Sequence, residues 1–134
     1  MSSELVRSVE LMTESIVKRR SYNFALKIVR LCEHLKENQH FEIAQQLLRS
    51  GTSIGANVEE ALAGQSRKDF FAKMSIASKE TRESNYWLRL LKDSEICDTN
   101  EVQDLIDKSE VLIKILTSIV KTGQENRKQL KTQN

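Results

Sequence analysis

The sequence predicts an all-α protein, an antiparallel up-down-up-down four-helix bundle with left-handed packing. The chain of 134 residues contains no proline and only four glycines, so little in it would interrupt a helix. Its apolar residues recur at spacings of three and four, the pattern of helices with one buried face. Short connections between segments of similar length favour antiparallel neighbours. We expect a bundle domain over residues 16–122, an N-terminal arm over 1–15 and a basic C-terminal tail over 123–134.

The first two helices follow from apolar periodicity. Residues 1–15 carry scattered apolar side chains near helical spacing, which predicts either a short helix or a frayed terminus. The first full helix is expected over 16–37, on the pattern Val17, Phe24, Ile28, Leu31 and Leu35. The second is expected over about 41–62, with Gly64 as a left-handed stop after it.

The third helix, expected over about 66–92, begins with Ser66 as its N-cap and Asp69 three residues later. A seam of apolar and small side chains runs along it at spacings of four and three: Phe70, Met74, Ala77, Thr81, Ser84, Leu88 and Leu91. The fourth helix, with Thr99 as its N-cap, carries a wide apolar stripe as far as Val120. Beyond that stripe we expect the chain to fray.

Two glycines inside the second helix indicate close packing. Each interior glycine costs about 1 kcal/mol relative to alanine. Gly51 and Gly55 are four residues apart and share one face, so another backbone is expected to approach the helix there. Asn57, on the same helix, is expected to form a polar pair that aligns the second and third helices, because an unsatisfied buried amide is costly.

Three residues of the third helix are expected to stabilise packing. Glu80 and Glu83 are interpreted as partners in ion pairs between helices or subunits, and a catalytic carboxylate pair is the weaker alternative. Trp87 lies off the main seam and is expected to anchor a subunit interface or a second core face.

Charge is unevenly placed along the chain. Residues 66–92 hold seven basic and three acidic side chains, whereas residues 93–112 hold seven acids and one lysine. A basic strip could bind the phosphates of a nucleic acid, and the opposite-sign blocks could dock one subunit on another. The ordinary alternative is a solvated helix face. The candidate phosphate-binding residues are Lys18, Arg19, Arg20, Arg67, Lys68, Lys73, Lys79, Arg82 and Arg89.

Other function classes lack the residues they need. A di-iron bundle requires Glu-x-x-His on two helices, and only Glu37 with His40 has that spacing. Cys32 and His34 are two apart on a helix and diverge, so we expect no metal, no cofactor and no catalytic residue. The absence of a long apolar run and of a signal-like start predicts a cytoplasmic protein without membrane contact. A disulfide between Cys32 and Cys97 is the weaker alternative to two thiols.

Most of the chain, roughly residues 16–122, also resembles a known family. The residues that carry the resemblance are Gln46, Arg49, Ser53, Ile54, Asn57, Glu59, Gly64, Arg67, Asp69 and Phe70. They are similar to the pattern of the bacterial four-helix-bundle proteins named after intervening sequences in 23S ribosomal RNA genes. Gly55 stands where many members have proline, so the resemblance does not imply a fixed kink there.

The resemblance implies an antiparallel bundle that often assembles as a ring of five, with no established catalysis. Related accessory proteins of diversity-generating retroelements form such rings and bind nucleic acid and a reverse transcriptase. We therefore expect a non-enzymatic homo-oligomer, a pentamer by resemblance, that binds RNA or a nucleic-acid-processing protein. The alternative is an accessory factor for protein–protein interaction that binds no nucleic acid.

Overall fold

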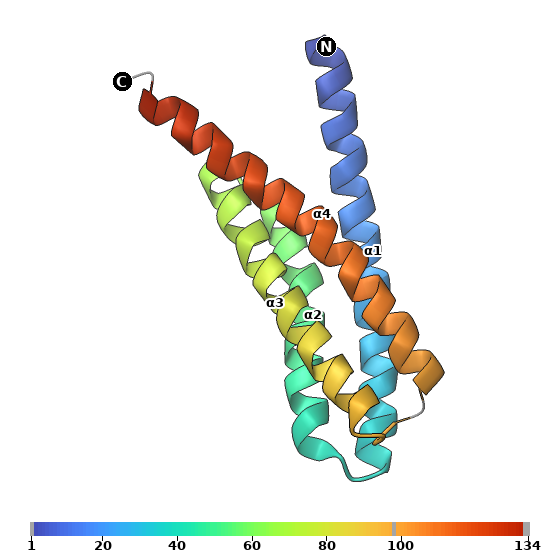
Figure 1. The fold of residues 1–134 in the computed structure, drawn as a ribbon. Helices are drawn as coiled ribbons and strands as arrows, with labels where there is room; N and C mark the ends of the chain where they lie inside the picture. Colours follow the sequence, from blue (N-terminus) through green and yellow to red (C-terminus); the bar gives the residue numbers. More distant parts are fainter. Residues whose placement is uncertain (1, 98, 133–134) are drawn as a thin grey trace.

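The protein folds as a bundle of helices that alternate in direction (Figure 1). The computed structural model describes residues 2–97 and 99–132, apart from the side chain of Thr99. The helices within these ranges are α1 (Ser3–Glu37), α2 (Phe41–Ala63), α3 (Arg67–Asp93) and α4 (Thr99–Thr132). Each helix packs against its neighbours in the chain, and α4 closes on α1, so that α1 and α3 stand at opposite corners. The predicted all-α bundle is confirmed.

The first and last helices, α1 and α4, are longer than the sequence pattern predicts. Helix α1 begins at Ser3, where the side chain of Ser2 caps it by accepting a hydrogen bond of 3.2 Å from the amide of Leu5. Helix α4 continues to Thr132, so the expectation that the chain frays after the apolar stripe is wrong. Both predicted domain boundaries therefore fall inside continuous helices. Figure 1 shows that the ends of α1 and α4 diverge beyond the rest of the bundle.

The core is built from one apolar face of each helix. All seven predicted seam residues of the third helix are buried, as are the five apolar residues that define the first. Full burial of a leucine, isoleucine or phenylalanine side chain contributes about 1.5–3 kcal/mol. The three- and four-residue periodicity therefore identified the face that holds the bundle together.

The two interior glycines of α2 face α1. A Cβ atom at Gly55 would lie 3.4 Å from the carbonyl oxygen of Ser21, so the α1 backbone is the neighbour there, at a distance that leaves room for a methyl group. At Gly51 the neighbour is a side chain and not a backbone, because a Cβ atom would lie 2.7 Å from Cγ2 of Ile28. Packing between α1 and α2 therefore requires a glycine at Gly51 and not at Gly55.

The connections between helices confirm one expected cap and correct another. The amide of Asp69 donates to Oγ of Ser66 at 3.1 Å, so Ser66 is the N-cap of α3. Gly64 has φ −67° and ψ 154°, an extended conformation, and the expected left-handed stop is wrong. Glycine gives space here instead, since a Cβ atom would lie 2.6 Å from Oδ2 of Asp69. Thr99 is the first residue of α4, and its predicted capping side chain lies outside the described residues.

Candidate nucleic-acid interface

The outer face of α3 gathers four of the predicted basic residues. Their spacings of 11, 3 and 7 residues place them on one side of the helix, and all four are exposed: Lys68, Lys79, Arg82 and Arg89. From first to last they cover about 30 Å at 1.5 Å per residue. We call these four residues the α3 basic face.

Neutral partners hold two members of the α3 basic face in place. Arg82 donates from Nη2 to Oγ1 of Thr117 at 3.0 Å. Arg89 donates from Nε to Oδ1 of Asn85 at 2.8 Å, and its guanidinium lies 6.0 Å from the ring centre of Tyr86. Lys68 and Lys79 have no hydrogen-bond or ion-pair partner in the part of the chain that the structure describes. No acid therefore neutralises these four cations there.

Two other predicted lysines are paired with acids of α2. Lys18 lies 3.9 Å from a carboxylate oxygen of Glu59, and Lys73 lies 3.1 Å from one of Glu60. These pairs join α1 to α2 and α3 to α2, away from the α3 basic face. Their charge is partly neutralised, so they are weaker candidates for phosphate binding.

Arg19 and Arg20 form a separate basic patch. They line a shallow hollow between α1 and α4 together with Lys108. Because α1 and α3 stand at opposite corners of the bundle, α4 lies between this patch and the α3 basic face. The residues of the expected strip therefore lie on two helices that do not contact each other, and a continuous strip stays a prediction.

Close to that patch, Asp104 links α1 and α4. One of its carboxylate oxygens accepts from Lys27 at 2.9 Å and the other accepts from Lys108 at 3.0 Å. These hydrogen bonds, that of Lys27 first, hold the pKa of Asp104 below its usual range. Lys108 is thereby engaged with an acid, which leaves Arg19 and Arg20 as the unpaired cations of the hollow among the described residues.

Glu80 and Glu83 form ion pairs between helices, as expected. Both contact Arg49 of α2, which reaches Oε2 of Glu80 with Nη1 at 3.2 Å and hydrogen-bonds Glu83 with Nη2. Burial raises the pKa of Glu80, and the hydrogen bond to Glu83 raises the pKa of Arg49. A partly buried carboxylate with an arginine partner stabilises the contact between α2 and α3, and its geometry gives no support to catalysis.

We expect Arg49→Ala to lower the free energy of unfolding by about 1 kcal/mol at neutral pH. The substitution leaves the carboxylates of Glu80 and Glu83 together without their cation. Because Glu80 already has a raised pKa, it takes up a proton as the pH falls, and the loss of stability caused by the substitution should become smaller towards pH 4. Urea denaturation at neutral pH and at pH 4 measures this difference in stability. Arg30→Ala, at an exposed arginine of α1, is the control, and an equal loss in both variants would contradict the role of the pair.

Asn57 does not form the expected pair between helices. Its amide nitrogen donates to the backbone oxygen of Ser53 at 2.9 Å and to Oγ of Ser53 at 3.0 Å, both within α2. The half-buried amide is satisfied locally by the preceding turn. The prediction that Asn57 aligns α2 with α3 is therefore wrong.

Small hydroxyl side chains perform that alignment instead. Oγ of Ser84 donates to Oγ of Ser50 at 2.9 Å, which joins α3 to α2, and both residues are buried. Nδ2 of Asn85 donates to Oγ of Ser109 at 2.9 Å, which joins α3 to α4. The sequence offered one signal for this contact, because Ser84 lies on the predicted seam, where a polar side chain needs a partner on the facing helix.

Trp87 packs against the core and is half-buried. Its ring lies 5.2 Å from that of Tyr86 in an edge-on arrangement. Nε1 of Trp87 is buried and has no hydrogen-bond partner among the described residues. The position fits the expected second core face, and a role in a subunit interface stays a prediction.

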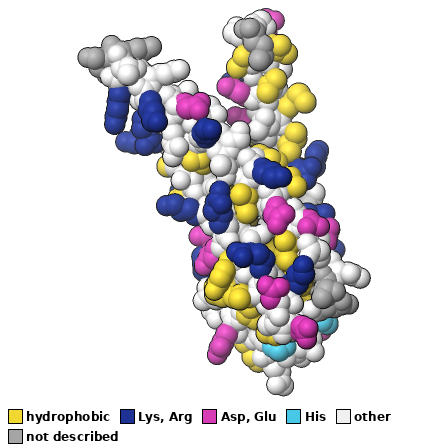
Figure 2. All heavy atoms as spheres, in the orientation of Figure 1, with side chains coloured by type: hydrophobic (Ala, Val, Ile, Leu, Met, Phe, Trp, Pro, Cys, Tyr) yellow, Lys and Arg dark blue, Asp and Glu magenta, His cyan; other side chains and the backbone are white. Residues whose placement is uncertain are grey.

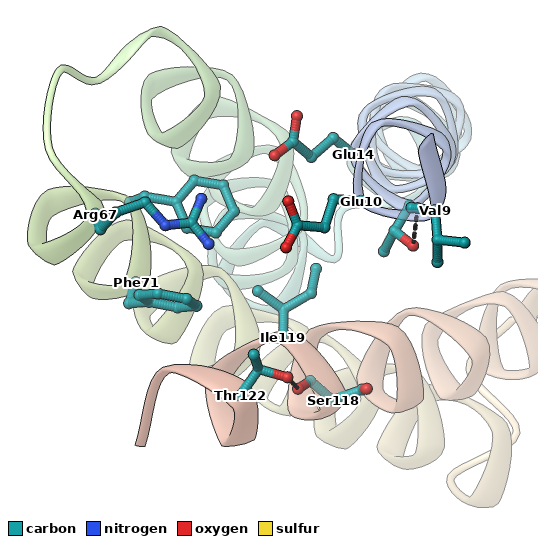
Figure 3. A pocket seen from close by; sticks show the side chains of 10 residues that line it. Val9, Glu10, Glu14, Arg67, Phe71, Ser118, Ile119 and Thr122 are labelled. Carbon is teal, nitrogen blue, oxygen red and sulfur yellow. Dashed lines mark hydrogen bonds between the residues drawn. The ribbon is translucent and has the colours of Figure 1, made fainter. Parts of the chain in front are cut away.

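A hollow of about 170 Å³ opens where α1 and α4 begin to diverge (Figure 3). Arg67, the remaining predicted basic residue, lies over this hollow with its guanidinium 4.9 Å from the ring centres of both Phe70 and Phe71. Glu10 and Glu14 of α1 line the opposite side and point towards it. Arg67 therefore belongs to the end of the bundle and not to the α3 basic face.

Neither a metal site nor a membrane helix is found in the described ranges. They contain no group of three or more His, Cys, Asp or Glu side chains that could hold a metal ion. Cys32 is buried, donates to the carbonyl of Ala44 at 3.4 Å and is not disulfide-bonded. Burial raises its pKa to about 11, which keeps the thiol protonated and unsuited to metal binding. No helix over residues 2–97 and 99–132 has the length and apolar character needed to cross a membrane.

Comparisons with known proteins agree with the fold. The family model for "23S rRNA-intervening sequence protein" matches residues 13–118. The chain is also similar to a crystal structure from Bacteroides thetaiotaomicron, described as a protein with unknown function from the S23 ribosomal protein family. The two share 43% sequence identity and a TM-score of 0.77, over 81% of this chain and 98% of that chain. A search of curated proteins found no match.

Proposed function

Because the chain belongs to the 23S rRNA-intervening sequence protein family, we propose that it is a non-enzymatic scaffold that self-associates and binds RNA through the α3 basic face. The observation that carries this proposal is the set of four cations on one helix face, with no acid paired to them among the described residues. Each cation that neutralises a phosphate releases a counterion, so such a face attracts RNA without reading its sequence.

The hydrogen bonds of two of the cations support this choice of face. The contacts of Arg82 with Thr117 and of Arg89 with Asn85 use only part of each guanidinium. The remaining N–H groups can donate to phosphate oxygens, and less side-chain entropy is lost because the arginines are already positioned. Tyr86, 48% exposed beside Arg89, offers a ring on which an RNA base could stack.

Self-association would bring several copies of the α3 basic face together in one particle. Exposed apolar side chains beside the basic residues, Ile76 and Leu90 among them, provide surface that an assembly can cover. A ring of five, the assembly that the family resemblance implies, would present several basic faces to one RNA. Simultaneous binding of several phosphate segments raises the apparent affinity above that of a single subunit.

A titration of labelled single-stranded RNA at low and at physiological salt tests the proposal. We expect binding at low salt that weakens on adding salt, with a slope of log affinity against log salt of about −0.7 for each phosphate contact. Absence of binding at low salt would overturn RNA binding. The exposed acids that follow α3 would then favour the second candidate function, an accessory factor whose basic and acidic surfaces dock protein on protein.

A further inference from the structure

The first turns of α1 carry an apolar seam without a partner. Leu5, Val9, Met12 and Ile16 are separated by four, three and four residues, the spacing of a coiled-coil seam. Leu5, Val9 and Met12 are 51%, 51% and 62% exposed, and Val9 also lines the hollow of Figure 3. We call residues 3–16 the N-terminal extension; it is about 20 Å long at 1.5 Å per residue.

The extension forms one wall of an open groove, which is lined by Val9, Glu10, Thr13 and Glu14, and the rest of the apolar seam lies on the adjacent side of the helix. The other wall is the end of α4, where Ile119 lines the hollow and Leu130 is 63% exposed. Phe70 and Phe71 of α3 close the base, and the α4 backbone approaches so closely that a Cβ atom at Gly123 would lie 2.5 Å from the ring of Phe71. Figure 2 shows the V-shaped opening between the two helix ends, with hydrophobic side chains along the arm formed by α1.

The two walls carry opposite charge. The extension has three acids, Glu4, Glu10 and Glu14, against Arg7. The end of α4 has four bases against Glu125: Lys121, Arg127, Lys128 and Lys131. A partner of uniform charge would be repelled by one wall. A second copy related by a two-fold axis would instead place its acidic extension on the basic wall and its basic α4 on the acidic wall.

We propose that a second copy of this chain docks in this groove, so that the two N-terminal extensions and the two α4 ends form a four-helix bundle between subunits. The other copy would cover Val9 in the groove and extend over the adjacent apolar seam of each extension. Most of both walls lies outside residues 13–118, the part matched by the family model, so this interface is a feature of this chain's own ends. The proposal rests on the self-association put forward above and adds to it a two-fold contact at the ends of α1 and α4.

Light scattering over a concentration series tests the proposal with a matched pair of variants. Val9→Lys places a charge in the seam, whereas Leu11→Lys places the same charge on the same extension outside the seam, at a residue that is 50% exposed. We expect the particle mass to fall by a factor of two in Val9→Lys and to stay at the wild-type value in Leu11→Lys. The factor is two whether the unit that pairs is one chain or a ring. Far-UV circular dichroism checks that both variants remain folded.

A charge exchange keeps the test independent of any folding defect. One variant carries Glu4→Lys with Glu10→Lys, and the other carries Arg127→Glu with Lys131→Glu. Each alone should have half the wild-type particle mass, and an equimolar mixture should regain the full mass, because both walls then face opposite charge again.

The outcomes separate this interface from self-association in general. A wild-type particle mass in Val9→Lys, or a mixture that stays at half mass, would overturn the proposed interface while self-association stands. A wild-type mass of 15.4 kDa at every concentration would overturn both. Either result would mean that a second copy of this chain does not occupy the groove.

Discussion

Gly51→Val is expected to lower the free energy of unfolding by about 3 kcal/mol, the upper end of the usual cost of adding a larger side chain to a packed core. A Cβ atom at this position would lie 2.7, 2.9 and 3.2 Å from Cγ2, Cγ1 and Cβ of Ile28. Isoleucine is stiff at χ1 in a helix, so α1 must move away from α2 to make room. Thermal and urea denaturation monitored by circular dichroism measure the loss.

Two substitutions in α2 serve as controls for Gly51→Val. Ala56→Val adds the same β-branched side chain at an exposed position and should cost only the difference in helix propensity, about 0.5 kcal/mol. Gly55→Ala places its Cβ atom 3.4 Å from the carbonyl oxygen of Ser21, an ordinary contact, and should be neutral or stabilising by up to about 1 kcal/mol. A Gly51→Val protein as stable as Ala56→Val would contradict the observed packing of α1 on α2.

Neutralising the α3 basic face is expected to reduce RNA affinity at low salt by about a hundredfold or more. The variant replaces Lys68, Lys79, Arg82 and Arg89 by glutamine, which keeps the side chains polar. Four phosphate contacts per subunit would be lost, so the salt dependence should also flatten by about 0.7 in slope for each contact. Fluorescence anisotropy with labelled RNA measures both quantities.

The control replaces lysines that are already paired with acids. Lys18→Gln with Lys73→Gln removes two positive charges whose partners are Glu59 and Glu60. This variant should keep RNA affinity within a few-fold of the wild type, because paired surface cations offer less charge to a phosphate. An equal loss of binding free energy for each charge removed in the two variants would show that net charge, and not the α3 face, governs binding.

The sequence predicted the bundle well where apolar periodicity decides the structure. The seam from Phe70 to Leu91 is buried at every predicted position. Helix ends were harder to predict. The apolar side chains of residues 3–15 stay exposed and residues 123–132 carry only Leu130, so no buried face marks where these helices end. The role of Gly64 was predicted wrongly because a glycine can serve either a left-handed backbone or close packing. Here the backbone is extended, and the glycine leaves space for the side chain of Asp69.

The candidate site was only partly predictable. Charge counts identified basic residues along α3, but the separation of Arg19 and Arg20 from them depends on the diagonal placement of α1 and α3. The roles of Glu80 and Glu83 were foreseen, whereas the pairing of Ser50 with Ser84 requires knowledge of how two helices align. Asn57 finds its partner one turn away, which periodicity alone does not reveal.

The mass of the chain in solution, alone and with RNA, tests the proposed scaffold most directly. Light scattering coupled to gel filtration at low and high salt measures it. We predict a particle several times heavier than 15.4 kDa, which at low salt elutes together with RNA and at high salt releases it. A mass of 15.4 kDa at every salt and protein concentration, with RNA eluting separately, would contradict a self-associating RNA-binding scaffold.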